Sequence, residues 1–531
     1  MARRLSFFVV VVLVALMRAG GTAQEPDART VLQAALKAMG GENLRSITYS
    51  GNEGYVAAVG QNYNPANDWP APLITTYTRT IDYEARSSRE EYGLTTERPA
   101  QYGPVGGGNS PVITTPIIGE QRRNWFVRDA AAWNVDGTNV VPQPAVAELR
   151  QLDIWLTPHG CLKAALMPGA NPIAIERTEQ NKGRITAVSF LALGKYRVQC
   201  AMNSKNLVER VQTYLPNPVV GDLYHEFVYG DYKDFNGVMF PTDFHAHHDL
   251  DDDLEGQGVN VSGGHNSFGL TVSSVQVNVA NAAPAIPEAA RTATVPQVVV
   301  QAQKIGNGLF YMGGGTHASV AVEFRDHITV FDAPLNEARS LAVIREIKRV
   351  IPNKPIKYVV SSHHHWDHLG GLRAYVASEN VTVVVQQNNL PYYAEVLWIR
   401  PWTLQPDRLA LFPPEEVSEG YTFETVGQKH VLSDGTRTME IYNVQGLQHA
   451  QGMLIAYLPQ EKMVLEADLF TPPAANAPMP ALVTASHRTF VNNVQRLGLD
   501  VQTIVPIHGG RTFPWAEFAK FVASGKPAPG N

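Results

Sequence analysis

The sequence predicts an α+β protein with a β-rich N-terminal half and a C-terminal half in which strands alternate with helices. Three observations carry this prediction. Short alternating apolar runs, separated by Gly, Pro and Asn, fill residues 24–278. Apolar residues at strand and helix spacing alternate over 297–531. Between them, residues 279–296 contain three prolines among small residues, which is typical of an extended, unpacked linker.

The length and composition are those of a folded protein with more than one domain. The chain has 531 residues, and at roughly 100–200 residues per domain this suggests two large domains or three small ones. Hydrophobic residues make up 44% and charged residues 17%, which is ordinary for a soluble globular chain. The formal net charge of −6 provides no basic surface, so we expect no nucleic-acid partner.

The N-terminus has the pattern of a secretory signal peptide. Arg3 and Arg4 precede the apolar run Leu5–Met17, and small residues follow as far as Ala23. The apolar run is 13 residues long, short of the ~20 that a membrane-spanning helix needs. We therefore predict a signal peptide at 1–23, export to the periplasm or the medium, and no membrane span after cleavage.

The N-terminal half begins with one predicted helix and continues in strands. Ala28–Met39 has a helical apolar face and stops at Gly40 and Gly41. Gly183–Ala192 and Leu207–Leu215 are typical of the strands that follow. Many short strands with turn residues between them predict an antiparallel sheet or an open barrel.

The two cysteines leave two alternatives open. Cys161 and Cys200 can pair in an oxidising compartment, or they can be two separate buried thiols. Neither lies in a CxxC motif or near a histidine cluster, so a metal role is not expected.

The C-terminal half alternates strands and helices after an antiparallel start, which indicates an α/β sandwich. The expected helices are Leu335–Ile351, 386–398 and 486–498. The expected strands are Leu309–Met312, Ala318–Phe324, His327–Phe331, Ile356–Ser362, Val381–Val385, Leu454–Leu458 and Thr503–Ile507.

A cluster of metal-ligand residues follows the strand Ile356–Ser362. His363, His365, Asp367 and His368 form an HxHxDH pattern that ends in two glycines, where the backbone can turn tightly. Neutral imidazoles and a carboxylate are the ligands that a zinc-like ion prefers. Four such residues within six positions at a strand end predict a metal site rather than a loop that is rich in histidine by chance.

The segment HHHWDHLGG resembles the signature of the metallo-β-lactamase superfamily, which needs three further ligands downstream. His449 in GLQHAQGMLIAYLP, Asp468 in MVLEADLF and His508 in IVPIHGG match them in order, and Asp332 matches the early structural Asp. The resemblance implies an αββα sandwich over 297–531.

Carried over to this chain, the resemblance implies two divalent metal ions. The first would be held by His363, His365 and His449, the second by Asp367, His368 and His508, with Asp468 bridging them. His364 and Trp366 would point away or line the rim. Because Asp468 stands where many true β-lactamases have Cys, zinc is the first expectation but iron or manganese also suits the site.

Other polar residues allow two interpretations each. His245, His247 and His248 precede an acidic run, and a solvated strand end explains them better than a metal site. His487 is a candidate for the cleft. Arg511 would meet an anionic substrate group or form a surface salt bridge.

The leading hypothesis is an exported dinuclear metal-dependent hydrolase that acts on an ester, lactone, thioester or amide of a small molecule. Two metals can supply a bridging hydroxide at neutral pH, and Asp367 or Asp468 would move the proton. We expect activity to be lost on acidification and on chelation. A nuclease would share the ligand set but fits neither export nor the acidic charge. The oligomeric state stays open.

The alternative hypothesis is a periplasmic protein that binds lipid or another apolar ligand and has a secondary metal domain. The segment VLQAALKAMGGENLRSITYSG, with the strands after it, loosely resembles bacterial periplasmic domains with a lipoprotein-carrier-like half-barrel. In that family the concave face shelters acyl chains.

Overall fold

The computed structural model describes residues 27–67, 69–95, 120–179, 183–248, 265–413 and 422–528. The predicted signal peptide, 1–23, lies outside the described residues. Within them, no helix combines the length and the apolar character that crossing a bilayer requires.

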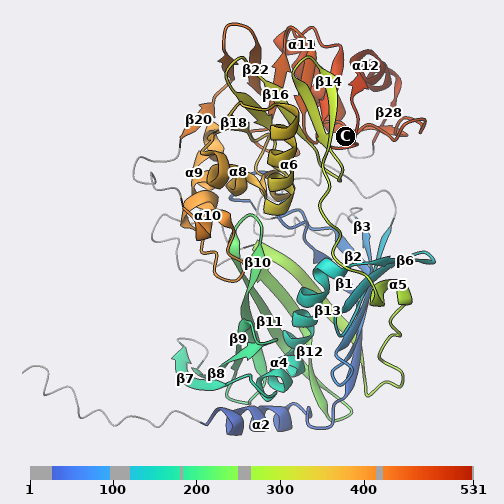
Figure 1. Ribbon diagram of the computed structural model, residues 1–531. Helices are drawn as coiled ribbons and strands as arrows, with labels where there is room; N and C mark the ends of the chain where they lie inside the picture. The colour runs from blue at the N-terminus through green and yellow to red at the C-terminus, as the bar shows by residue number, and fades with distance from the viewer. Residues whose placement is uncertain are drawn as a thin grey trace, which may run out of the picture.

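The described part of the N-terminal half is built on one antiparallel sheet of thirteen strands, coloured blue to green in Figure 1. Their order is β6-β5-β4-β3-β2-β1-β13-β12-β11-β10-β9-β8-β7, so β1 pairs with β13 and joins two meanders. The strands are β1 Ser46–Val56, β2 Leu73–Asp82, β3 Ser87–Thr95, β4 Gln121–Arg128, β5 Ala131–Asp136, β6 Asn139–Pro142, β7 Ile173–Glu179, β8 Gly183–Ala192, β9 Tyr196–Met202, β10 Val208–Asn217, β11 Gly221–Phe235, β12 Val238–His248 and β13 His265–Val277.

Helices pack against this curved sheet and fill its core. They are α2 Ala28–Ala38, the 3-10 turn Pro144–Val146, α3 Ala147–Trp155 and α4 Pro158–Ala165. The predicted first helix is found as α2, which begins after Asp27 because that carboxylate accepts the backbone N–H of Thr30 at 2.9 Å. Trp155 of α3 and Leu162 of α4 lie in the same apolar cluster as the sheet residue Phe190. The inner face of the sheet is therefore occupied by the protein's own helices.

Both cysteines are reduced and buried in this core. Cys161 lies on α4 and Cys200 on β9, with no disulfide between them. Burial raises the pKa of the Cys161 thiol well above its ordinary value. Of the two alternatives that the sequence left open, the structure shows buried thiols.

One stretch of the segment between the halves is packed, whereas most of residues 279–296 are exposed or partly exposed, as expected of a linker. Residues Glu288–Arg291 form the short helix α5, which lies against β5 and β6. Ala290 is 4% exposed, and Arg128 of β4 donates to the carbonyl of Pro284 at 3.1 Å. Proline fixes its own φ but does not prevent the small residues beside it from packing. Ala290 is therefore buried where the segment lies along the edge of the sheet.

The C-terminal half contains two main sheets, coloured yellow to red in Figure 1. In the first, with order β14-β15-β16-β17-β18-β19-β20, the pairings up to β16–β17 are antiparallel and those after it are parallel. Its strands are β14 Gln301–Gly306, β15 Leu309–Gly313, β16 Ser319–Glu323, β17 Ile328–Phe331, β18 Ile356–Val360, β19 Thr382–Gln386 and β20 Phe423–Val426.

The second sheet has the order β21-β22-β23-β24-β26-β27, and a small pair, β25–β28, lies apart from it. Its strands are β21 Lys429–Ser433, β22 Thr438–Asn443, β23 Leu454–Leu458, β24 Met463–Glu466, β26 Thr503–Pro506 and β27 Phe513–Pro514, and the small pair is β25 Leu482–Val483 with β28 Lys526–Pro527.

The two sheets pack face to face, and helices cover their outer sides. One apolar cluster joins Val320 and Phe331 of the first sheet to Ile455 of the second. Val343 of α6 packs on the outside of the first sheet, and Phe490 of α11 packs beside the second. This four-layer αββα arrangement confirms the predicted fold class.

The three helical regions that the sequence predicted in this half are present near the expected positions, at Glu337–Val350, 387–399 and Ala485–Leu497, whereas the other helices of this half were not among those expected. The helices and turns are α6 Glu337–Val350, α7 Trp366–Leu369, α8 Leu372–Glu379, the 3-10 turn Gln387–Asn389, α9 Leu390–Ala394, a π-helical turn Glu395–Ile399, α10 Arg408–Leu411, α11 Ala485–Leu497 and α12 Trp515–Ser524.

Among the described residues, hydrogen bonds join the halves at two places. At one, the carboxylate of Asp222 at the start of β11 accepts the backbone N–H groups of Thr403 and Leu404, at 3.0 Å each. At the other, the β1–β2 loop, defined here as residues 57–72 without Asp68, reaches the C-terminal half beside α7. This loop brings the N-terminal half to the predicted metal site.

Candidate metal centre

The segment that carries the histidine cluster is fixed by one buried carboxylate. Asp332 follows β17 in the left-handed region at φ 64° and is fully buried. It accepts the backbone N–H of Ser362 at 2.6 Å, the Ser362 hydroxyl at 2.8 Å and Nδ1 of His368 at 2.9 Å. Because β17 and β18 run parallel, these contacts join the ends of two neighbouring strands. Asp332 thereby fixes the backbone before the cluster and the ring of His368.

Four side chains form a first group of potential ligands. His363, His365, His449 and Asp468 place one ligand atom each within 4.8 Å of one another. Oδ2 of Asp468 lies 2.8 Å from Nε2 of His449 and 3.4 Å from Nε2 of His363. All four residues stand in loops at strand ends, which is where their elements converge.

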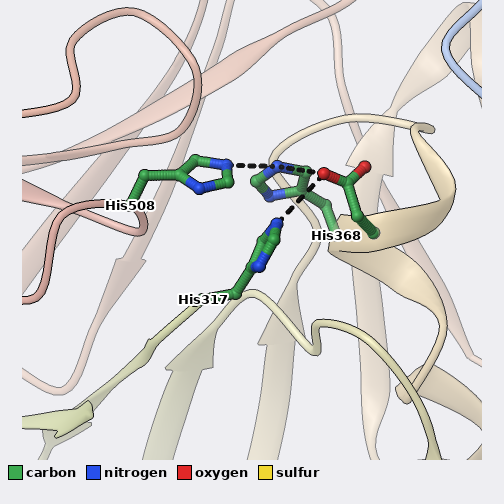
Figure 2. A group of neighbouring side chains, drawn as sticks. His317, His368 and His508 are labelled. Carbon is green, nitrogen blue, oxygen red and sulfur yellow. Dashed lines mark hydrogen bonds and ion pairs between the residues drawn. The ribbon is translucent and has the colours of Figure 1, made fainter. Parts of the chain in front are cut away.

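A second group lies directly beside it. Asp367, His368 and His508 gather within 4.8 Å together with His317, as Figure 2 shows for the three imidazoles. The other oxygen of Asp468, Oδ1, lies 2.7 Å from Nε2 of His508 and 3.1 Å from Nε2 of His368. The two oxygens of one carboxylate thus face the two groups.

The structure brings together all seven residues that the sequence singled out as ligands. Asp367 and His368 lie on α7, His449 precedes β23, Asp468 follows β24 and His508 follows β26. Asp468 adopts φ 59°, a left-handed conformation that Asp tolerates better than most residues. His317 was not predicted, because no motif surrounds it.

In His363 and His365, a hydrogen bond at one ring nitrogen fixes which of the two nitrogens faces the other ligands. Nε2 of His365 donates to a backbone carbonyl, and Nδ1 of His363 donates to Ser362 at 3.0 Å, because that hydroxyl already donates to Asp332. Nδ1 of His365 and Nε2 of His363 are buried without a hydrogen-bond partner. Buried unpartnered nitrogens directed at a shared carboxylate are what a metal ion would satisfy, so the residues fit two divalent ions.

Burial and charge hold most of these groups in their ligand forms. Burial, aided by the charge of His368, lowers the pKa of His363 to about 4, and burial also lowers the pKa of His365 well below its ordinary value. Burial alone would raise the pKa of Asp468, but the charge of His368 and three imidazole contacts hold it well below its ordinary value. Neutral imidazoles beside an ionised carboxylate are the states that bind metal.

His368 differs from the other histidines in the group. Burial opposes its charge, yet the carboxylates of Asp468 and Asp332 raise its pKa well above the ordinary value. A metal ion at Nε2 would therefore displace a proton from this ring.

The β1–β2 loop of the N-terminal half touches the ligands directly. Nε2 of Gln61 donates to Oδ1 of Asp367 at 2.7 Å. The carbonyl of Asn62 accepts from Nε2 of His364 and from Nε2 of His365, each at 2.9 Å. Sequence reasoning missed both residues, since the loop has no motif and one contact uses only backbone.

Residues at the intervening positions of the motif point away from the ligand groups, as expected. His364 is buried, with Nδ1 3.5 Å from the side-chain nitrogen of Asn389. Nε1 of Trp366 donates to the hydroxyl of Tyr392 at 2.8 Å.

The other candidates lie outside the centre. His487 caps the start of α11 with Thr484, packs against Phe470 and belongs to neither ligand group. Nε of Arg511 donates to the carbonyl of Pro473 at 3.0 Å. The β12 histidines belong to neither ligand group among the described residues; they are His245, His247 and His248.

A small cavity lies beside the centre, next to the loop that carries His449. Its volume is about 230 Å³. The lining is polar but carries no charged side chain; its residues are Tyr63, Gln386, Asn388, Asn443, Val444, Gln445, Gly446, Leu447, Ala450, Gln451 and Gly452.

Comparison with known proteins agrees with the geometry. Residues 312–456 match the family described as the metallo-beta-lactamase superfamily, which confirms the resemblance predicted from HHHWDHLGG for the C-terminal half. The matched region contains five of the seven predicted ligands and ends before Asp468 and His508. The resemblance of the N-terminal half to a carrier stays a prediction.

Individual relatives match only parts of the chain. A linear primary-alkylsulfatase from a Pseudomonas species is 32% identical over 103 residues, which is 18% of this chain and 15% of the relative. A metallo-beta-lactamase from Pontibacter korlensis is 19% identical and covers 42% of this chain and 97% of its own, with a TM-score of 0.32. An inverting sec-alkylsulfatase from a Pseudomonas species is 17% identical and covers 42% of this chain and 40% of its own, with a TM-score of 0.31.

Proposed function

We propose that this chain, whose C-terminal half contains a metallo-β-lactamase superfamily region, is a metal-dependent hydrolase of small molecules with a dinuclear centre. One observation carries the proposal. The two oxygens of Asp468 face two separate groups of ligands, at 2.8 Å from His449 on one side and 2.7 Å from His508 on the other. A carboxylate in this position can bridge two ions.

The metal ligands would be His363, His365 and His449 for the first ion and Asp367, His368 and His508 for the second, with Asp468 shared. Two bound divalent ions supply a water nucleophile at neutral pH and stabilise the negative charge that develops on the substrate. Zinc, iron or manganese suits such a donor set.

The protein's own groups would orient the centre and move the proton. Asp332 holds the ring of His368, and Gln61 holds Oδ1 of Asp367. The hydrogen bond from His317, with the charge of His368, keeps the pKa of Asp367 well below its ordinary value even though burial opposes this. Asp367 is 31% exposed at its side chain, whereas Asp468 is 11% exposed. Asp367 is therefore the better placed of the two to pass a proton to a leaving group.

The cavity beside His449 supports a substrate whose uncharged part lies on the His449 side of the metal centre. Its lining offers amides and a phenol but no ionised side chain. Burying an ion without a countercharge costs several kcal/mol or more. We therefore propose a substrate with a neutral polar or apolar part and a carboxylic ester, lactone, thioester or amide bond. The alkylsulfatase relative adds a sulfate ester to that set.

Export is part of the proposal and rests on the charged and apolar pattern of residues 1–23. A mature chain beginning after Ala23, recovered from the periplasm or the medium, would support it. Retention of residues 1–23 on the purified native protein would contradict it.

The function is tested by metal analysis together with turnover. The full chain is purified, its metal is measured by elemental analysis, and chromogenic esters, lactones, thioesters, amides, β-lactams and alkyl sulfates are assayed. His365→Ala is compared with His364→Ala, because both rings are buried and both donate to Asn62, but only His365 lies in a ligand group.

We expect two ions per chain in the wild type and in His364→Ala, and loss of metal and turnover in His365→Ala. Fewer than two ions with no turnover of any substrate would overturn the proposal. Lipid that copurifies with such an inert chain would instead favour the apolar-ligand carrier.

A further inference from the structure

His317 stands outside the seven predicted ligands, yet its ring enters the second ligand group. It lies in the turn between β15 and β16, shortly after three consecutive glycines. Its ring centroid is 4.1 Å from that of His508 and 5.3 Å from that of His368. The residue is 9% exposed, so the ring lies in the site rather than on the surface.

The backbone of His317 is held from two sides. The buried guanidinium of Arg339, on α6, donates to the carbonyls of Met312, Gly313 and His317 at 2.7, 2.9 and 3.2 Å. His317 also forms an isolated antiparallel bridge with His508. This packing fixes the direction of the side chain independently of any contact the ring makes.

The inner nitrogen of the ring meets the carboxylate of the second group. Nε2 of His317 lies 3.0 Å from Oδ2 of Asp367, and Figure 2 shows this contact beside the rings of His368 and His508. The outer nitrogen, Nδ1, lies 2.8 Å from the hydroxyl of Thr316. The contact with Asp367 has the proton on Nε2; with an ion in place of that proton, the tautomer protonated on Nδ1 would donate to Thr316 and leave Nε2 to bind the ion.

The spacing of the donor atoms matches ligands around one ion. With metal–ligand distances of about 2.1 Å, two donor atoms at right angles lie about 3.0 Å apart and two at tetrahedral angles about 3.4 Å apart. Nε2 of His368 and Nε2 of His508 are 3.2 Å apart. At that distance the two nitrogens share a proton in a hydrogen bond when the site holds no ion, and both can bind one cation that takes the place of that proton.

We propose that His317 is an additional ligand of the second metal ion through Nε2. This position would then have three imidazoles, from His317, His368 and His508, with the carboxylate of Asp367 and the shared Asp468. Five protein donors exceed the four of a tetrahedral site. The second position therefore suits an ion with a larger coordination number, such as manganese or iron, better than zinc.

The competing role for His317 is a hydrogen-bond donor that only orients Asp367. Two substitutions separate the roles. His317→Gln keeps an N–H donor for Asp367 but is a poor metal ligand, whereas His317→Glu supplies an anionic ligand but cannot donate while ionised. His430→Gln is the matched control, since His430 pairs with Glu424 and belongs to neither ligand group.

The full chain is stripped with a chelator and titrated with Mn²⁺ by calorimetry. The wild type and His430→Gln are expected to bind two equivalents. In His317→Gln the second equivalent should bind at least about 10-fold more weakly, although the donor to Asp367 is kept. His317→Glu should bind it more tightly than His317→Gln. A His317→Gln chain with wild-type affinity, or His317→Glu binding no tighter than His317→Gln, would overturn the inference.

A second readout identifies the ring itself. In the Co²⁺-loaded chain, each imidazole bound to the metal gives a hyperfine-shifted exchangeable N–H proton resonance. His317→Gln should remove one such resonance and leave the others. The inference rests on the proposed dinuclear centre but not on turnover. A wild type that binds fewer than two ions would refute the centre, whereas an unchanged His317→Gln spectrum refutes only the role of His317.

Discussion

The backbone carbonyl of Asn62 lies 2.9 Å from Nε2 of His365, although the two residues are 303 positions apart. This contact fixes the proton on Nε2, so that Nδ1 of His365 faces the other ligands. The N-terminal half therefore takes part in shaping the metal centre, and the consequences can be measured.

The close approach of the β1–β2 loop to α7 depends on a glycine. Gly60 has φ 78°, and a Cβ there would lie 2.4 Å from Cγ of Trp366. We expect Gly60→Ala to displace the loop, loosen Asn62 from His365 and lower turnover by about 10–100-fold, because small displacements of catalytic groups are costly.

The control for this substitution is Gly237→Ala, which has φ 82° and open space around the added Cβ. Both changes carry the same kind of backbone cost, on the order of 1 kcal/mol. Equal turnover in the two variants would show that the contact with Trp366 has no role.

The hydrogen bond from Gln61 positions a predicted ligand. Removing it in Gln61→Ala leaves Oδ1 of Asp367 with one fewer donor. Changes to groups that orient metal ligands usually reduce metal affinity by about 10–100-fold. Calorimetric titration of the chelator-stripped chain measures this, with Gln460→Ala as control because Gln460 bonds only an exposed turn. Equal affinity in the two variants would remove Gln61 from the site.

The buried carboxylate of Asp332 is expected to serve both folding and metal binding. Asp332→Asn keeps the shape of the side chain but replaces one accepting oxygen by an amide nitrogen. It therefore cannot accept all three hydrogen bonds that Ser362 and His368 donate to Asp332. An unsatisfied buried donor costs about 1–3 kcal/mol, so Tm should fall together with the metal content. Asp326→Asn, at an exposed carboxylate, should change neither. A normal metal content in Asp332→Asn would contradict the role.

Removing the metal should both inactivate and destabilise the protein. A ligand that binds only the folded state stabilises it by about 2.7 kcal/mol at 100 times its Kd. Chelation should therefore lower Tm and abolish turnover, and readdition of zinc, manganese or iron should restore both to different extents. A chain that keeps full turnover after complete removal of metal would refute the proposed chemistry.

The stability of the N-terminal half should fall on mild acidification because of His159. Burial lowers the pKa of His159 in the folded chain to about 4 from 6.5, so the unfolded chain binds the proton first as the pH falls. The free energy of unfolding should drop between pH 6.5 and 4, by at most about 1.4 kcal/mol per pH unit from this group.

Denaturant unfolding at several pH values measures this slope. His159→Gln should flatten it. Equal slopes in wild type and His159→Gln would show that His159 does not carry the effect.

The ligands could be predicted because they carry local patterns. Each follows or precedes an apolar strand, and the HxHxDH spacing places four metal-donor side chains within six consecutive residues. The fold of the C-terminal half follows from the same apolar periodicity, as the agreement between the predicted strand Leu454–Leu458 and β23 shows.

The remaining features depend on tertiary contacts that no local pattern encodes. His317 becomes part of the site only because Arg339 and the bridge to His508 aim its ring inwards. Asn62 acts through its backbone, so its residue type carries no signal. The helix Glu288–Arg291 forms where prolines suggested an extended linker, because Ala290 finds an apolar surface to cover.

The contact between Asn62 and His365 also constrains the order of folding. Contacts between residues that are distant in sequence form late, because closing the chain between them costs conformational entropy before the contact stabilises the fold. Two large apolar clusters lie mainly within one half each, whereas the β1–β2 loop needs both halves in place before it can settle on α7. On this order of folding, the ligand groups would be accessible to metal before the loop docks beside them.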